Sequence, residues 1–234
     1  KKMDFEDELI PGVLVKRYKR FFVDIKLKNK IITAHCPNSG SMLNLLKKGN
    51  PVWFTKAKND KRKLKYTLQI IEVDRIKYCI NTHITNKIIQ ESINNKLIDE
   101  LKEYEIVKSE KKFGNNTRFD FYLANIKENI KAYLEVKSVS LSRKKNCAEF
   151  PDAVTDRGKK HLENLILANQ QGYKSYLIFL VQIENCNSFN IASDIDPLYF
   201  KVFKEALKKN VNVLCYNCKF SDKGISINKN IKIV

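Results

Sequence analysis

The first 84 residues alternate short apolar runs with turn-forming residues, and apolar positions at helical spacing are scarce there. The runs have the length and the alternation of strands: GVLVKRY, RFFVDIKL, KIITAHC, PVWFTKA, KYTLQIIEV and IKYCINTHI. Five or six short strands in so little chain favour a small closed or partly open β-barrel. We expect the oligonucleotide-binding (OB) type.

The pattern changes near Asn86, where apolar residues recur every three or four positions and predict one amphipathic helix over 86–104. Strand-like and helical runs then alternate: strands at 117–124 and 131–139, a helix from Thr155, a buried strand at 175–183, a helix at 197–209 and a strand at 211–220. This alternation is typical of layered α/β domains. We therefore expect a mixed α/β protein, with a barrel domain in 1–84 and an α/β domain with a central mixed sheet in 85–234.

A formal net charge of +18 at pH 7 favours a polyanionic partner, because cationic side chains release counterions from phosphates. Only seven of the 44 basic residues are Arg, so a solvated lysine coat without a partner stays open. The six cysteines lack the dense spacing of a secreted scaffold and the first residues form no apolar leader, so we expect reduced thiols in a cytoplasmic protein. No apolar run is long enough for a membrane span, and we expect no membrane partner. The oligomeric state stays open.

The strands TRFDFYLA and KAYLEVKSV carry the candidate chemistry. Side chains alternate along a strand, so Glu135 and Lys137 share one face, while Phe119 and Phe121 oppose Asp120. If the two strands form a hairpin over the loop 124–131, Asp120 lies opposite Glu135, because 120 and 135 are equally far from its centre at 127.5. Adjacent carboxylates repel each other, so this arrangement favours a bound cation.

Hard oxygen ligands suit Mg²⁺ or Mn²⁺, held by Asp120, Glu135 and the carbonyl of Val136. Lys137 would then orient a water molecule or stabilise charge on a phosphate. Glu110, ahead of the first strand, is either a further acid near the metal or a surface charge. The alternative is a cross-strand salt-bridge cluster on a solvated sheet face.

Four segments resemble, in order and spacing, the signature segments of the sugar fermentation stimulation protein A (SfsA) family: HCPNSGSM (35–42), SEKKFGNNTRFDF (109–121), YLEVKSVSL (133–141) and FPDAVTDRGKKHLENL (150–165). The likeness runs through essentially the whole chain. It implies an OB-type barrel followed by a domain resembling the PD-(D/E)XK nucleases, with DNA binding as the attributed activity. Under this resemblance the nuclease-like D, E and K fall on Asp120, Glu135 and Lys137.

Several segments could contact nucleic acid phosphates. On the helix that Thr155 caps, Arg157 and His161 share a face, and Gly158 between them would allow close backbone approach. The turn HCPNSG could hold a phosphate on its backbone near Ser39. Basic residues interleaved with aromatics in the first 80 residues could form a binding groove. They are Arg17 and Arg20, and Lys61, Arg62 and Lys63 in the loop KNDKRKLK (58–65).

The leading hypothesis is a DNA-binding protein with an Mg²⁺- or Mn²⁺-dependent phosphodiesterase site. The competing hypothesis is a non-catalytic DNA-binding or regulatory protein whose nuclease-like site is idle. A thiol enzyme based on Cys36 is a third reading, although the adjacent His35 would point to the opposite strand face. Cys215 and Cys218 form a lone CxxC whose members face opposite sides of a strand, which argues against zinc.

Overall fold

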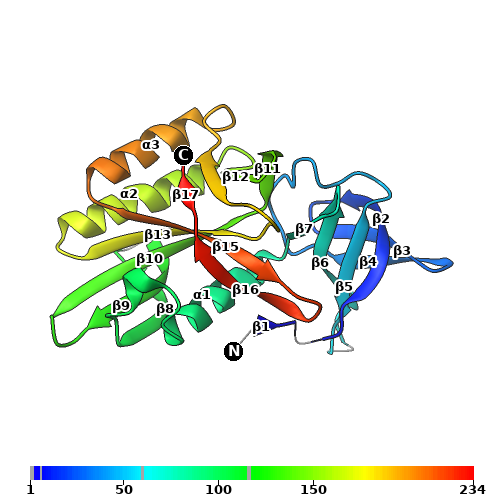
Figure 1. Ribbon diagram of the computed structural model, residues 1–234, viewed down its shortest axis with the longest axis horizontal. Helices are drawn as coiled ribbons and strands as arrows, with labels where there is room; N and C mark the ends of the chain where they lie inside the picture. Colours follow the sequence, from blue (N-terminus) through cyan, green and yellow to red (C-terminus); the bar gives the residue numbers. More distant parts are fainter. Residues whose placement is uncertain (1–2, 6, 59–60, 115–116) are drawn as a thin grey trace.

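The computed structural model describes residues 3–5, 7–58, 61–114 and 117–234. A β-barrel built from the first third of the chain adjoins a layered α/β part built from the rest, as Figure 1 shows. This architecture confirms the mixed α/β fold class predicted from the sequence. No helix among the described residues is both long and apolar enough to cross a membrane.

The barrel is a six-stranded sheet in the order β4-β3-β2-β5-β6-β7. It closes through a parallel contact between β4 and β6, where His35 pairs with Thr67. Leu14, Val23 and Phe54 point inward and are fully buried. The barrel is therefore OB-like, as expected. Its strands are β2 (Ile10–Tyr18), β3 (Phe22–Leu27), β4 (Lys30–His35), β5 (Pro51–Lys56), β6 (Tyr66–Val73) and β7 (Ile76–Cys79).

A seven-stranded mixed sheet in the order β1-β16-β15-β13-β10-β9-β8 forms the centre of the α/β part. The two-residue strand β1 pairs with β16, so Met3 and Asp4 belong to this sheet rather than to the barrel. The sequence did not predict β1, β8 or β16. The strands are β1 (Met3–Asp4), β8 (Ile106–Phe113), β9 (Thr117–Asn125), β10 (Ile130–Val139), β13 (Lys174–Val181), β15 (Asn212–Phe220) and β16 (Gly224–Asn230).

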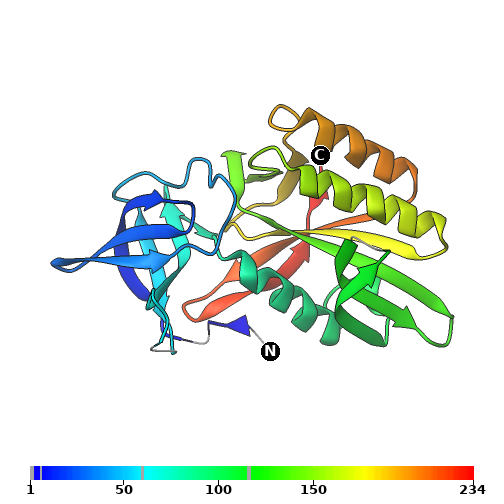
Figure 2. The same cartoon turned by 180° about the vertical axis from the view of Figure 1, so that it is seen from behind.

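Helices cover both faces of this sheet, α1 (Thr85–Asn94) on one side and α2 (Asp156–Gln170) with α3 (Pro197–Lys208) on the other (Figures 1 and 2). A second, four-stranded sheet lies beside α3 in the order β11-β12-β14-β17. Its strands are β11 (Leu141–Lys144), β12 (Cys147–Phe150), β14 (Ser188–Ile191) and β17 (Lys232–Ile233). The helices at 156–170 and 197–208 confirm the sequence prediction.

The helix predicted over 86–104 is shorter than expected. It ends at Asn94, and Lys96 takes a left-handed conformation with φ of 58°. The rest of the segment continues as a turn and the 3₁₀ helix η2 (Asp99–Leu101), while a second 3₁₀ helix, η1 (Thr82–Ile84), precedes α1. Leu97 is exposed as a result, whereas Leu101 still reaches the core. Apolar spacing alone did not reveal the break at the consecutive asparagines 94 and 95.

The predicted hairpin of β9 and β10 is present with the predicted register. Asn125 pairs with Ile130 and Phe121 with Leu134, so paired residues are equally far from the centre at 127.5. The ladder stops at Phe121, one residue before Asp120 and Glu135 would pair. Phe119 does not share a face with Phe121 as expected, because it packs against Phe113 in the other core cluster. The strands therefore separate at the candidate site.

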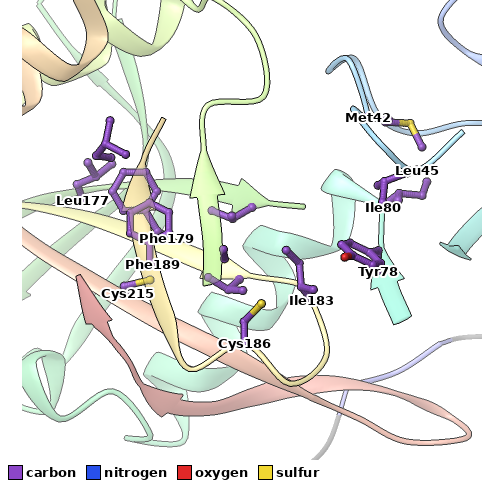
Figure 3. Packing of buried hydrophobic residues seen from close by; sticks show 14 of the residues in the cluster. Met42, Leu45, Tyr78, Ile80, Leu177, Phe179, Ile183, Cys186, Phe189 and Cys215 are labelled. Carbon is purple, nitrogen blue, oxygen red and sulfur yellow. The ribbon is translucent and has the colours of Figure 1, made fainter. Parts of the chain in front are cut away.

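Backbone hydrogen bonds and a shared core join the barrel to the α/β part. The amide of Cys79 donates to the carbonyl of Gln182 over 2.9 Å, and Tyr78 forms a bridge with Ile183. Figure 3 shows the apolar core passing from Ile80 and Tyr78 of the barrel to Ile183 and beyond. The two parts share backbone hydrogen bonds and one apolar core. The domain boundary expected near residue 84 stays a prediction.

Candidate active site

Asp120 lies where β9 separates from β10. Its carboxylate, instead of a backbone carbonyl of β9, accepts a hydrogen bond from the β10 backbone. Its Oδ2 accepts a hydrogen bond from the backbone N–H of Val136 over 2.8 Å. Its Oδ1 accepts one from the side-chain amide of Asn86 on α1 over 2.8 Å. Each carboxylate oxygen accepts one hydrogen bond from the described residues and so keeps lone-pair capacity for a further ligand. The carboxylate is therefore held rigidly and can still accept another ligand.

Glu135 is almost fully buried beside Asp120, with 2 % of its surface exposed. Its Oε1 accepts a hydrogen bond from the Lys137 ammonium over 2.6 Å and also contacts Nδ1 of His161 on α2. Lys137 Nζ and His161 Nδ1 lie 3.1 Å apart, so the three side chains form one cluster. The other oxygen, Oε2, is buried and has no hydrogen-bond partner within the part of the chain that the structure describes. A buried carboxylate oxygen left unpaired in this way is costly unless a cation or a donor reaches it.

The two carboxylates differ in acidity because their surroundings differ. Burial first, and then the negative charge of Glu135, raises the pKa of Asp120 to about 6. Burial also acts to raise the pKa of Glu135, but the positive charge of Lys137 and the hydrogen bond with His161 outweigh it and leave that pKa below its ordinary value. Near neutral pH both carboxylates are therefore mainly ionised, and Asp120 carries the less stable negative charge.

A cavity of about 320 Å³ opens above this cluster and is bounded by both parts of the molecule. The α/β part contributes Asp120, Glu135 and Lys137, together with Arg157 on α2. The barrel contributes the turn 38–40 on the opposite side. A ligand in this cavity would touch both the sheet carboxylates and the barrel.

The turn 38–40 is held in place from two sides. Arg17 of β2 donates to the carbonyl oxygens of Asn38 over 2.7 Å and Gly40 over 3.0 Å. On the other side, Asp152 accepts from the backbone N–H of Met42 over 3.0 Å. A methyl group on Gly40 would come within 2.6 Å of the Asp152 carboxylate, so this close approach requires glycine. The barrel is therefore a rigid wall of the cavity.

Arg17 and Arg20 were expected to contact nucleic acid. The structure instead uses Arg17 as an internal brace, because its guanidinium also donates to the carbonyl of Arg20 over 2.7 Å. Arg20 occupies the exposed turn between β2 and β3 with φ of 65° and does not line the active-site cavity. Ser39 does line it.

The basic loop 58–65 does not border the active-site cavity. Arg62 lines a second cavity on the barrel, while Lys61 and Lys63 line neither of these two cavities. Asn59 and Asp60 of this loop lie outside the described residues, as do Asn115 and Asn116 of the segment 109–121.

Glu110 is not brought to the cavity. It lies within β8, level with Asp120 in the register, but its φ of 57° interrupts the regular alternation. Its carboxylate is exposed and pairs with Arg118 over 3.2 Å. The surface-charge reading of Glu110 therefore fits the structure, and a place beside the metal does not.

On α2 the three expected contact residues have different positions. Arg157 is exposed at the cavity rim, and His161 lies deeper in the same cavity, in the cluster with Glu135. Gly158 packs against the helix cap: an added methyl group would lie 2.8 Å from the Thr155 side chain and 3.2 Å from Tyr199. Glycine is needed there for packing, so close approach to phosphate does not explain it.

The cysteines do not form a reactive site among the described residues. Cys36 is fully buried, and burial raises the pKa of its thiol, so it offers no accessible nucleophile. Cys215 and Cys218 belong to different core clusters, which confirms that they face opposite sides of β15. These features do not support the thiol-enzyme reading.

Sequence reasoning missed Asn86 and Asp152, which orient the site from other elements. Asn86 appeared only as the start of an amphipathic helix, and nothing local to it signals a bond to a residue 34 positions later. Asp152 belongs to the segment FPDAV, but its contact with Met42 spans 110 residues. Long-range contacts of this kind leave no periodic signal along one sequence.

Comparisons with known proteins agree with this fold. The description "Sugar fermentation stimulation protein RE domain" matches residues 83–224, and "SfsA N-terminal OB domain" matches residues 15–81. The solved structure of Pyrococcus furiosus SfsA in complex with Ca²⁺ superposes with a TM-score of 0.90 and 24% identity, over 100% of this chain and 99% of that one.

Curated relatives match along nearly the whole chain. A "Sugar fermentation stimulation protein homolog" of Pelagibacter ubique is 50% identical over 99% of both chains. A protein with the same description from a Marinomonas species is 41% identical over 98% of this chain and 90% of its own. The chain therefore belongs to the sugar fermentation stimulation protein (SfsA) family.

Proposed function

We propose that the protein hydrolyses phosphodiester bonds in DNA with a divalent metal ion held at Asp120 and Glu135. The observation that carries this proposal is the unpaired Oε2 of Glu135, buried beside a second carboxylate at the base of a cavity. Cation binding there would satisfy an oxygen that has no partner among the described residues, and would offset the burial and the charge repulsion that raise the pKa of Asp120.

The ligands present fit Mg²⁺ or Mn²⁺. Among the described residues no group of three or more His, Cys, Asp or Glu side chains is arranged to hold a metal ion. Two carboxylates suffice for Mg²⁺, which keeps several waters and is often completed by substrate phosphates. The Val136 carbonyl would be a further ligand. The Pyrococcus furiosus relative was solved with Ca²⁺, another cation that takes oxygen ligands, which supports this choice.

The residues around the carboxylates have distinct roles in this proposal. Asn86 and the Val136 amide hold Asp120 in one orientation through its two oxygens. Lys137 lies beside Glu135 and can donate a hydrogen bond to an attacking water or to a phosphate oxygen. The bound ion would polarise the phosphate and lower the pKa of a water molecule. His161 holds the Glu135 carboxylate and the Lys137 ammonium in position.

DNA as the substrate class rests on charge and on the family resemblance. The net charge of +18 provides attraction for a phosphate backbone. Arg157 at the rim of the active-site cavity adds a guanidinium close to where a scissile phosphate would lie.

The test is cleavage of end-labelled single- and double-stranded DNA with Mn²⁺ or Mg²⁺. Wild type, Asp120→Ala and Lys137→Ala proteins are compared after circular dichroism confirms their folding. We expect cutting by the wild type alone and only with the metal. If the wild type leaves all substrates intact, the nuclease proposal fails.

A non-catalytic DNA-binding role is the second candidate. One observation favours it: Lys137 and His161 already satisfy Oε1 of Glu135, so half of that carboxylate is paired without a metal. Intact DNA that is still bound by the wild type, together with no Mn²⁺ binding in calorimetry, would support this role.

A further inference from the structure

A second cavity of about 680 Å³ lies between the barrel and the start of α1. The barrel side includes His35, Thr55 and Arg62, and the α1 side includes His83 and Lys87. Its volume is in the range of sites that enclose a small organic ligand. Neither the metal chemistry proposed above nor the family match assigns it a role.

The two cavities are separated by a narrow ridge of chain. Pro37 lines the second cavity, and the next residue, Asn38, lines the active-site cavity. Likewise, Thr82 lines the active-site cavity and the next residue, His83, lines the second cavity. Consecutive Cα atoms are about 3.8 Å apart, so the cavities adjoin across roughly one residue. A strand bound in both cavities would have to cross only this ridge.

The rings of Phe5, His35 and His83 line the second cavity. The centroids of the His35 and His83 rings lie 6.3 Å apart. Phe21 does not line the cavity, but its ring, 42 % exposed, stacks with that of His35 with centroids 6.2 Å apart. Burial, and then the nearby charge of Arg62, lowers the pKa of His35, so its ring is neutral near pH 7. A neutral ring beside exposed aromatic surface suits stacking of a nucleobase.

Hydrogen-bonding groups lie at the base of the second cavity. The side-chain amide of Asn81 donates to the side-chain oxygen Oε1 of Gln69 over 2.7 Å. The side-chain Nε2 of Gln69 donates to the Thr55 hydroxyl over 3.0 Å. All three side chains are buried. The amide nitrogens of Asn81 and Gln69 each keep a second N–H, and the Thr55 hydroxyl keeps its O–H. These three side chains can therefore still donate hydrogen bonds to a ligand. Such groups match the polar edge of a base.

The charges around the second cavity are mixed but suit a phosphate on one side. Lys58 pairs with Asp7 over 3.6 Å, which neutralises part of the wall. Arg62 stands on the barrel loop close to His35, where its guanidinium can meet a backbone phosphate. The wall therefore combines an aromatic face, amide groups and a cation, which are the three features that recognise a nucleotide.

We propose that the second cavity binds one nucleotide from an unpaired stretch of the same strand that enters the active-site cavity. A paired base is stacked inside a duplex and cannot enter a closed pocket without being flipped out. The preferred substrate is then single-stranded DNA, or DNA with a single-stranded end. This inference rests on the proposed function, because the strand is the substrate of the metal site.

The test measures the affinity of fluorescent thymidine oligonucleotides of two, four and eight nucleotides in EDTA, where a metal-dependent site cannot cut. Thymidine monophosphate as a competitor and a blunt duplex are measured beside them. The variants are His35→Ala and Arg62→Gln, and the matched control is Arg75→Gln. Arg75 is exposed in the turn after β6 and lines neither cavity.

We expect affinity to rise with oligonucleotide length and to exceed that for the duplex. Loss of a stacking ring weakens single-strand binding roughly five- to hundredfold, so His35→Ala should show a change of that size. Arg62→Gln should reduce the slope of log K against log[salt] by about 0.7, as for one phosphate contact on a single strand. Arg75→Gln should bind like the wild type.

Unchanged octamer affinity in both His35→Ala and Arg62→Gln would overturn the inference. A monophosphate that binds as tightly as the octamer would also overturn it, since the pocket would then hold a free nucleotide. Wild-type hydrolysis of bis(p-nitrophenyl) phosphate with Mn²⁺ tests the metal centre separately. If that hydrolysis is absent while His35→Ala still weakens DNA binding, the proposed function fails and the nucleotide pocket stands.

Discussion

Asp152 of the α/β part accepts a hydrogen bond from the backbone N–H of Met42 in the barrel over 3.0 Å. This bond joins segments 110 residues apart and holds the turn 38–40 against the sheet carboxylates. The barrel therefore completes the candidate active-site cavity.

Replacing Asp152 with Ala removes the acceptor of the Met42 amide. Because Met42 is buried, we expect a loss of about 1–3 kcal/mol in the free energy of unfolding, together with slower DNA cleavage. Urea unfolding and cleavage rates check the two effects. Asp222→Ala removes an exposed acid in a turn between β15 and β16 and serves as the control. Equal stability of the two variants would show that this contact contributes little.

Asp120 makes the metal-free protein less stable as the pH rises. Its folded pKa is raised to about 6 from an ordinary value of 3.8, so the folded state binds the proton more tightly than the unfolded state does. The resulting stabilisation is complete below about pH 4 and is lost as the pH rises through 6, with a total of about 3 kcal/mol. In EDTA, Asp120→Asn should therefore gain stability relative to the wild type as the pH rises from 4 to 7. Parallel stability curves for the two proteins in urea would contradict the raised pKa.

Gly158→Ala should destabilise the protein even though alanine favours helices. The added methyl group would lie 2.8 Å from the Thr155 side chain and 3.2 Å from the Tyr199 ring, so the capping Thr155 side chain must move and the buried ring must yield slightly. Overpacking of this kind costs about 1–3 kcal/mol, against a helix-propensity gain of at most about 1 kcal/mol. Thermal unfolding beside Lys160→Ala, an exposed position on the same helix, measures the difference. A melting temperature at or above that of the wild type would refute the packing argument.

Binding of duplex DNA should weaken steeply with salt. If phosphates provide the contacts, log K falls linearly with log[salt], with a slope of about −0.9 for each phosphate neutralised. Fluorescence anisotropy over a range of salt concentrations gives that slope. A flat response would indicate that the basic surface does not bind the phosphate backbone.

The hairpin of the candidate site was predictable because its information is local. Two strands of alternating pattern flank one short loop, and their symmetry about 127.5 determines which residues pair. The interruption at Asp120 was not predictable, since the Asp120 carboxylate bonds the Val136 amide and the Asn86 side chain, and the contact with Asn86 joins residues 34 positions apart.

Residue roles were harder to predict than residue types. Arg17 was recognised as basic, but its guanidinium donates to four carbonyl groups that only the folded chain brings together. Likewise His161 was placed on the correct helix, and its contact with Glu135 depends on how α2 packs on the sheet. Charge and spacing identify candidates, whereas tertiary contacts decide which of them face the cavity.

In the proposed function the buried Glu135 and its half-buried neighbour Asp120 support DNA cleavage, and the exposed Glu110 does not. Glu135→Gln and Glu110→Gln each remove one negative charge, from β10 and β8 of the same sheet. Of these two residues, Glu135 lines the cavity and Glu110 is exposed outside it. Initial rates of Mn²⁺-dependent cleavage of single-stranded DNA compare the two variants with the wild type. We predict a loss of at least about a hundredfold for Glu135→Gln, as for removal of one strong transition-state interaction, and a rate close to wild type for Glu110→Gln. Equal rates for both variants, or full activity in Glu135→Gln, would contradict the account.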